Sequence, residues 1–199
     1  MSNNSNTLHH HLTEVQKGNR CFENAFQGVS RMILESKIEK VVVNGKTTYD
    51  FSIFREGSKH VIGMYDEINS FVSYVKDAAE GGSSKEMAFV LVGEPGNGKT
   101  FLVEFLSAKF RSFLALDKNR KYTFRFVNTD KLGDYGKIKT IESQTYEDPM
   151  ILGMNLFDDP DQNREYLAKQ AGFADKDIDV LYENYRPLGA CSGYIWNDI

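Results

Sequence analysis

The residues that most constrain this chain are 93–100, which read GEPGNGKT and match the pattern GxxxxGK[ST]. They stand between a short apolar run at residues 87–92 and a segment with apolar residues at helical spacing, residues 101–110. The apolar run predicts a strand that is buried on both faces of a parallel sheet. A strand, a glycine-rich turn and a helix, in that order, is the setting in which this pattern has a physical meaning.

Each residue type in the pattern suits the binding of phosphate. Glycines 93, 96 and 98 can adopt backbone angles that are closed to other residues, so successive N–H groups can point toward one anion. The predicted helix begins near Gly98 and adds the positive end of its dipole. Lys99 would place a positive charge between the β- and γ-phosphates, and the Thr100 hydroxyl would be a ligand of Mg²⁺. We therefore expect ATP and Mg²⁺ as cofactors, with Lys99 and Thr100 as the catalytic residues of the motif. The expected nucleotide contacts in this segment are Gly93, Glu94, Pro95, Gly96, Asn97, Gly98, Lys99, Thr100 and Phe101.

The remaining sequence suggests three regions. Residues 1–11, with their three histidines, are expected to form a disordered tail. Residues 12–57 are expected to form an accessory region, with a helical stripe interrupted by Gly18 and a β-hairpin at Asn44-Gly45. Residues 58–199 would hold the nucleotide-binding domain, with a helix over 64–79, a second strand over 122–127 and helical signals between 161 and 185.

Composition limits the partners and the compartment. The net charge is −4, so no global positive field favours nucleic acid. No apolar run reaches the length of about 18 residues that a membrane span needs. Cys21 and Cys191 are the only cysteines, which excludes a zinc site built on CxxC spacing and favours reduced thiols in the cytoplasm.

Hydrolysis or transfer also needs an acidic residue near the Mg²⁺ and a second positive charge. Asp130 follows the second predicted strand, and Asp158-Asp159 follows another apolar run. A turn or helix-cap role is the simpler interpretation of each aspartate. Residues 130–133 also fit the DxxG of GTPases, but no NKxD motif follows. Arg164 and Arg186 could meet transition-state charge, although solvated surface arginines are the commoner case.

A resemblance rests on these segments. Residues 62–68, IGMYDEI, followed by a helix and LVGEPGNGKT, look like the opening of an AAA+ ATPase core. In that superfamily an apolar-apolar-Gly turn lies against the adenine, which here implies Val61, Ile62 and Gly63. The resemblance is closer to the N-terminal part of PrkA-type bacterial serine protein kinases. It rests on residues 72–100, on the Glu147-Asp148-Pro149-Met150 step and on the helix before residue 40.

This resemblance implies an α/β fold of the P-loop NTPase, AAA+ type: a parallel sheet with flanking helices, preceded by a small helical and hairpin accessory region. It implies ATP-dependent phosphorylation of protein serine on a substrate that the sequence does not identify. The later acidic strand, sensors and arginine finger of the family are missing, so the core is expected to be incomplete, and Asp158-Asp159 would lie in an insertion. AAA+ relatives often form rings, so a homo-oligomer is one expected state. A small P-loop nucleotide kinase or transferase and a non-catalytic nucleotide-binding interaction domain stay open as alternatives.

Overall fold

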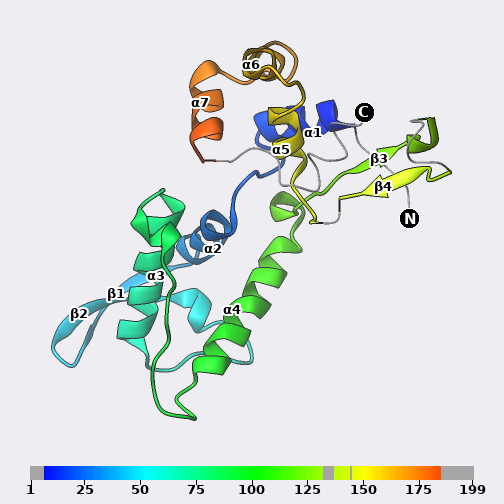
Figure 1. Ribbon diagram of the computed structural model, residues 1–199. Helices are drawn as coiled ribbons and strands as arrows, with labels where there is room; N and C mark the ends of the chain where they lie inside the picture. The colour runs from blue at the N-terminus through cyan, green and yellow to red at the C-terminus, as the bar shows by residue number, and fades with distance from the viewer. Residues whose placement is uncertain (1–6, 132–136, 144, 185–199) are drawn as a thin grey trace. The chain divides into compact units, whose positions relative to one another are not determined.

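The computed structural model describes residues 7–131, 137–143 and 145–184 of the 199-residue chain (Figure 1). The chain divides into two compact units. One unit is Glu23–Asp117, and the other combines Met1–Phe22 with Lys118–Ile199. We call them the loop unit and the outer unit, because the 93–100 motif lies in the first.

The loop unit is built from helices and one hairpin. Its elements are α2 (Ala25–Leu34), β1 (Ile38–Val43), β2 (Lys46–Phe51), η1 (Ser52–Phe54), α3 (Tyr65–Ala79), η2 (Ser83–Glu86) and α4 (Lys99–Leu114). Asn24 begins α2 with a capping box: its side chain accepts from the Gln27 N–H, and the Gln27 side chain accepts from the Asn24 N–H. Gly81 follows α3 with a left-handed φ of 85°, which is the expected way for this helix to end.

The predicted hairpin at Asn44-Gly45 is confirmed. Strands β1 and β2 pair antiparallel with Val43 opposite Lys46, which leaves a two-residue turn. Asn44 and Gly45 have φ values of 50° and 77°, as the favoured tight hairpin turn requires. The outer edge of β2 is covered by α3, because the Asn69 side chain donates to the Tyr49 carbonyl at 2.8 Å and accepts from the Tyr49 N–H at 3.3 Å.

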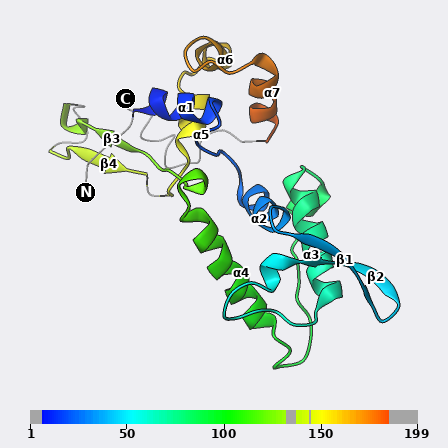
Figure 2. The ribbon, with the colours of Figure 1, turned by 180° about the vertical axis from the view of Figure 1, so that it is seen from behind.

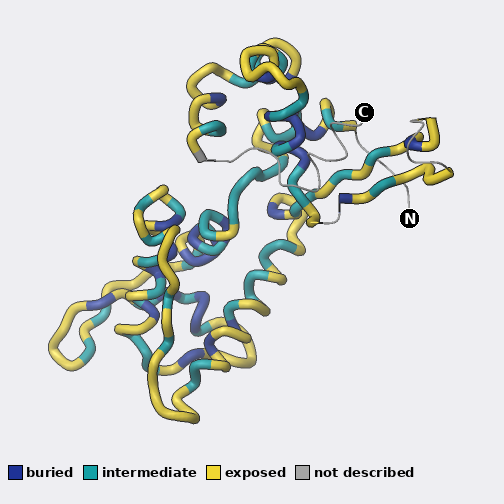
Figure 3. Tube along the Cα trace, in the orientation of Figure 1, coloured by how far each residue is buried: buried dark blue, intermediate teal, exposed yellow. Residues whose placement is uncertain are grey.

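The core of the loop unit draws on α2, β2, η1, α3 and α4, which are seen from behind in Figure 2 and carry the buried stretches in Figure 3. Leu102 and Phe105 of α4 pack with Ile68 and Val72 of α3, so the helical stripe predicted after the glycine-rich turn is confirmed. Phe54 is 1% exposed and stacks on Phe105 with ring centroids 6.1 Å apart. The other buried members of this core are Met32, Ile33, Phe51, Ile53 and Val61.

The outer unit contains α1 (Leu8–Gln16), η3 (Asp117–Asn119, shared with the loop unit at its first residue), β3 (Arg125–Val127), η4 (Thr129–Lys131), β4 (Thr140–Glu142), α5 (Pro149–Met154), α6 (Pro160–Lys169) and α7 (Asp175–Asn184). Its core consists of Leu12, Met150, Met154, Leu167, Ala171 and Ile178. Helix α1 begins inside the stretch that was expected to be a disordered tail. The reason is that Thr7 caps the helix and that His11 and Leu12 are buried.

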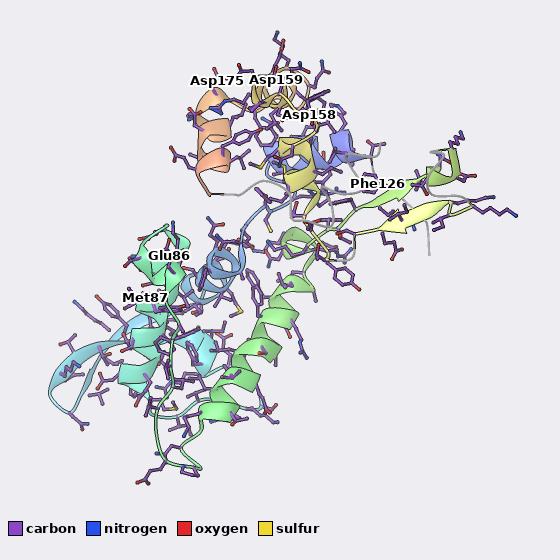
Figure 4. All side chains as sticks on the ribbon, viewed as in Figure 1. Glu86, Met87, Phe126, Asp158, Asp159 and Asp175 are labelled. Atoms are coloured by element: carbon purple, nitrogen blue, oxygen red, sulfur yellow. The ribbon has the colours of Figure 1, made fainter. Side chains whose placement is uncertain are left out.

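The sheets differ from the expectation of a parallel sheet. The described residues form two two-stranded antiparallel sheets, β1-β2 and β3-β4. The second predicted strand is reduced to β3, where Phe126 pairs with Ile141 (Figure 4). None of the described helices combines the length and the apolar character needed to cross a membrane.

Residues 87–92 were expected to form a strand buried on both faces, and this expectation was wrong. They form neither helix nor strand, and they run from the end of η2, where Figure 4 marks Glu86 and Met87, toward α4. Phe89 and Leu91 pack on the α3 side, whereas Met87, Val90 and Val92 are 61%, 71% and 89% exposed. The physical reason is the absence of a neighbouring strand: within the described chain, residues 88–92 make no backbone hydrogen bond.

Candidate phosphate-binding loop

The loop at residues 93–98 leads directly into α4. Gly96 and Gly98 have φ values of 89° and 73°, so both occupy the left-handed region that favours glycine. Gly93 does not have a positive φ, which corrects the expectation that all three glycines are needed for their backbone angles. Glu94, Pro95 and Asn97 are exposed, and the Asn97 N–H donates to the Glu94 carbonyl at 3.4 Å across the turn.

The Lys99 ammonium folds back over this loop. Its Nζ donates to the Gly93 carbonyl at 2.6 Å and to the Glu94 carbonyl at 2.7 Å. Among the described residues, the lysine is therefore held by neutral carbonyl oxygens and not by a carboxylate in a core ion pair. Because hydrogen bonds between a charged donor and an anion are stronger than those to neutral acceptors, an arriving phosphate could compete for this ammonium.

The beginning of α4 is open to an anion. Gly98 is the N-cap residue, and it makes no side-chain cap hydrogen bond to the N–H groups of the first turn. The first turn also contains no acidic residue, so the positive end of this 16-residue helix is not neutralised from within. Thr100 is exposed in this turn, where its hydroxyl fits the oxygen ligation that Mg²⁺ prefers. Phe101 is 36% exposed, and the centroid of its ring lies 6.1 Å from the centroid of the Phe105 ring.

The turn at residues 62–64 lies beside the loop. The Met64 Sδ is 3.8 Å from the position that a Cβ on Gly98 would occupy. Val61, before the turn, is 3% exposed, whereas Ile62 is 74% exposed. The structure therefore brings the turn that carries Ile62 and Gly63 together with Gly98, although the two segments are more than 30 residues apart in the sequence.

Of the three candidates for a magnesium-binding acid, Asp159 has a local structural role, and Asp130 and Asp158 are exposed. Asp159 is the N-cap of α6, where its Oδ1 accepts from the Asp161 N–H at 2.9 Å. Asp130 is exposed in η4, two residues after the left-handed Asn128. Asp158 is exposed just before α6 (Figure 4). The cap interpretation of Asp159 and the turn interpretation of Asp130 are thus confirmed, and all three residues belong to the outer unit.

Of the two candidate arginines, the structure describes only Arg164. Arg164 lies in the outer unit, where it pairs with Asp179 and stacks over Tyr182, its Cζ 5.2 Å from the ring centroid. Arg186 and Cys191 lie outside the described residues, as do residues 132 and 133 of the DxxG match. In the described ranges, no three His, Cys, Asp or Glu side chains are grouped as metal ligands would be.

Met64 is the neighbour of the loop that sequence reasoning assigned only to the apolar face of a helix. It caps α3 with a left-handed backbone, φ 54° and ψ 32°. The one signal in the sequence was the preceding Gly63, which marks a turn but does not show which side chain reaches Gly98.

Comparison of the chain with protein-family models, with curated proteins and with solved structures found no match.

Proposed function

We propose that this chain is the ATP-binding module of a PrkA-like serine protein kinase and binds Mg-ATP for hydrolysis or phosphoryl transfer to protein serine. The observation that carries the proposal is the local geometry at residues 93–100. Two left-handed glycines, an uncapped helix N-terminus and a lysine without a carboxylate partner converge on one turn. Together they offer an anion the amide donors, the helix dipole and the point charge that phosphate recognition uses.

In this proposal each part has one task. The N–H groups at the start of α4 hold the phosphates, and Lys99 leaves the Gly93 and Glu94 carbonyls to pair with them. Mg²⁺, when bound, would neutralise phosphate charge, and Thr100 is the residue that would hold it. The turn at residues 62–64 would receive the base, which supports ATP over free phosphate as the ligand.

The finer fold is part of the same proposal. We infer a fold of the P-loop, AAA+ type, in which the glycine-rich turn and α4 form the phosphate-binding part. The left-handed Gly96 and Gly98 directly before the 16-residue α4 support this assignment.

Calorimetric titration of ATP in the presence of Mg²⁺ tests the proposed function. We expect the wild-type chain to bind ATP and the Lys99→Ala variant to lose binding by at least about 100-fold, because a phosphate would lose a charged hydrogen bond. Lys85→Ala removes an exposed lysine outside the motif and is the matched control, with ATP affinity close to that of the wild type. Equal affinities of Lys99→Ala and wild type would contradict the proposal.

A non-catalytic nucleotide-binding domain is the second candidate. The N-cap role of Asp159 favours it, because the Asp159 carboxylate already accepts a hydrogen bond from the Asp161 N–H. We expect the 199-residue chain alone to hydrolyse ATP at well below about 1 per second. Binding without hydrolysis or serine phosphorylation, even in a longer polypeptide that contains this chain, would favour the second candidate over the first.

A further inference from the structure

The turn beside the phosphate loop has an unfavourable backbone. Gly63 and Met64 both have positive φ values, 73° and 54°. A left-handed backbone at a residue with a side chain is disfavoured and persists only where its surroundings fix it. Such residues cluster at ligand-binding sites, so the groups that hold Met64 in place bear on how the neighbouring loop binds its ligand.

The approach to the turn is fixed by two hydrogen bonds to backbone carbonyls. The Val61 N–H donates to the Phe54 carbonyl at 2.8 Å and closes the loop of residues 55–60. Lys109 of α4 donates from Nζ to the Glu56 carbonyl at 2.8 Å and ties this loop to the helix that begins at the phosphate loop. The chain therefore enters the turn from a defined direction.

The exit from the turn is held by Arg55. Tyr65 follows Met64, and its hydroxyl is hydrogen-bonded to Arg55 Nη2. The Arg55 Cζ also lies 5.0 Å from the centroid of the Tyr65 ring. Arg55 is itself oriented by Asp50 of β2, to which its Nε donates at 3.1 Å. Burial disfavours the Arg55 charge, but the hydrogen bonds to Asp50 and Tyr65 raise the pKa of its guanidinium above the usual value.

We propose that Arg55 and Tyr65 are positioning residues that hold Met64 against Gly98 and thereby shape the base end of the nucleotide site. The hydrogen bonds run from Asp50 through Arg55 to Tyr65. Tyr65 directly follows Met64, whose Sδ lies 3.8 Å from the position of a Cβ on Gly98. This inference rests on the proposed ATP binding and goes beyond the glycine-rich motif. Neither residue touches phosphate in it, so their loss should affect the nucleoside part of the ligand and spare the phosphate part.

Two ligands distinguish binding of the nucleoside part from binding of the phosphate part. ATP engages both the turn and the loop, whereas inorganic tripolyphosphate carries the phosphates without a base. We would measure the Kd of each, with Mg²⁺, for the full chain and for Tyr65→Phe, Arg55→Met and Arg55→Lys. Asp66→Asn is the matched control, because it breaks the exposed Lys46–Asp66 pair one residue beyond Tyr65. Thermal melting of each variant reports folding.

We expect Tyr65→Phe and Arg55→Met to weaken ATP about tenfold and tripolyphosphate less than about twofold. Arg55→Lys should restore part of the ATP affinity, and Asp66→Asn should leave both ligands unchanged. If Arg55→Met fails to fold, Tyr65→Phe decides the question, since it keeps the ring and removes only the hydroxyl. An unchanged ratio of the two Kd values in Tyr65→Phe would overturn this inference alone, whereas no ATP binding by the wild type would overturn the proposed function and this inference with it.

Discussion

Gly96 and Gly93 of the glycine-rich loop differ in how well each position would accept a side chain. Gly96 has a φ of 89° and no heavy atom within 4 Å of the position of an added Cβ. An alanine there would be strained by its backbone alone. Gly93 lacks a positive φ, and its added Cβ would meet Asn97 Nδ2 and Lys99 Nζ at 3.7 Å, an ordinary contact distance.

We predict that Gly96→Ala lowers the free energy of unfolding by about 1–2 kcal/mol, the cost of a left-handed alanine. Gly93→Ala should change it by less than about 0.5 kcal/mol, as most unstrained surface substitutions do. Urea unfolding of both variants beside the wild type measures the difference. Equal losses in the two variants would mean that the left-handed turn is not fixed in the folded chain.

Individual residues account for several turns and helix ends that could be predicted from the sequence. Asn44-Gly45, Gly81 and Gly98 mark their turns and helix ends because few other residues accept a positive φ. The left-handed Met64 could not be predicted in this way, since its conformation depends on Arg55 and Val61 of the folded loop unit.

At the scale of elements, the docking of α1 on α5 depends on a missing side chain. A Cβ added to Gly153 of α5 would lie 2.7 Å from Leu12 Cδ2 and 2.9 Å from Cδ1. Leu12 is fully buried, so it cannot move aside into solvent. Gly153 therefore permits the close approach of the two helices despite the poor helix propensity of glycine.

We predict that Gly153→Ala destabilises the chain by about 1–2 kcal/mol, because overpacking exceeds the gain in helix propensity. Leu12→Ala alone should cost about 2–5 kcal/mol through the cavity it creates. In the double variant the new methyl group would occupy part of that cavity. The sum of the single effects should thus exceed the effect of the double variant by about 1 kcal/mol or more, and strict additivity would contradict the proposed contact.

The link between α3 and η2 should respond to acid. Hydrogen bonds from Ser84 lower the pKa of Asp77 below its ordinary value of 3.8, and the Ser84 N–H donates to Asp77 Oδ2 at 2.9 Å. Since the folded-state pKa is lowered, the stabilisation is present above the unfolded value and is lost as the pH falls through the folded value.

Asp77→Asn removes this charge while it keeps the shape of the side chain. We expect the wild type to be more stable than the variant at neutral pH and the difference to shrink below pH 3.8. Urea midpoints of both proteins at neutral pH and at about pH 3 measure it. A difference that stays constant over this range would show that the Ser84 contact does not act through the carboxylate charge.

Elements with local signals were predictable, and those defined by distant partners were not. The break at Gly18 and the helices α3 and α4 follow from apolar spacing and glycine, and the structure confirms them. The short antiparallel pair β3-β4 depends on a partner strand, Thr140–Glu142, whose surroundings gave no periodic pattern. Residues 87–92 show the opposite case, where a strongly apolar run has no strand beside it in the described chain.

At the scale of the whole molecule, the proposed function concentrates ligand contacts in one of the two units. The glycine-rich loop, Lys99 and the 62–64 turn all belong to Glu23–Asp117, with the core of α3 and α4 beneath them. The acidic residues considered for Mg²⁺ belong to the other unit. Binding by this chain should thus depend on phosphate and base contacts made within the loop unit.

Amide hydrogen exchange with and without Mg-ATP tests this central claim most directly, because it reports on the backbone N–H groups that are proposed to hold the phosphates. We expect saturating Mg-ATP to slow exchange at residues 93–102 and, to a smaller extent, at residues 61–66, and we expect Lys99→Ala to abolish both effects. Unchanged exchange at residues 93–102 under conditions where ATP is bound would contradict this claim.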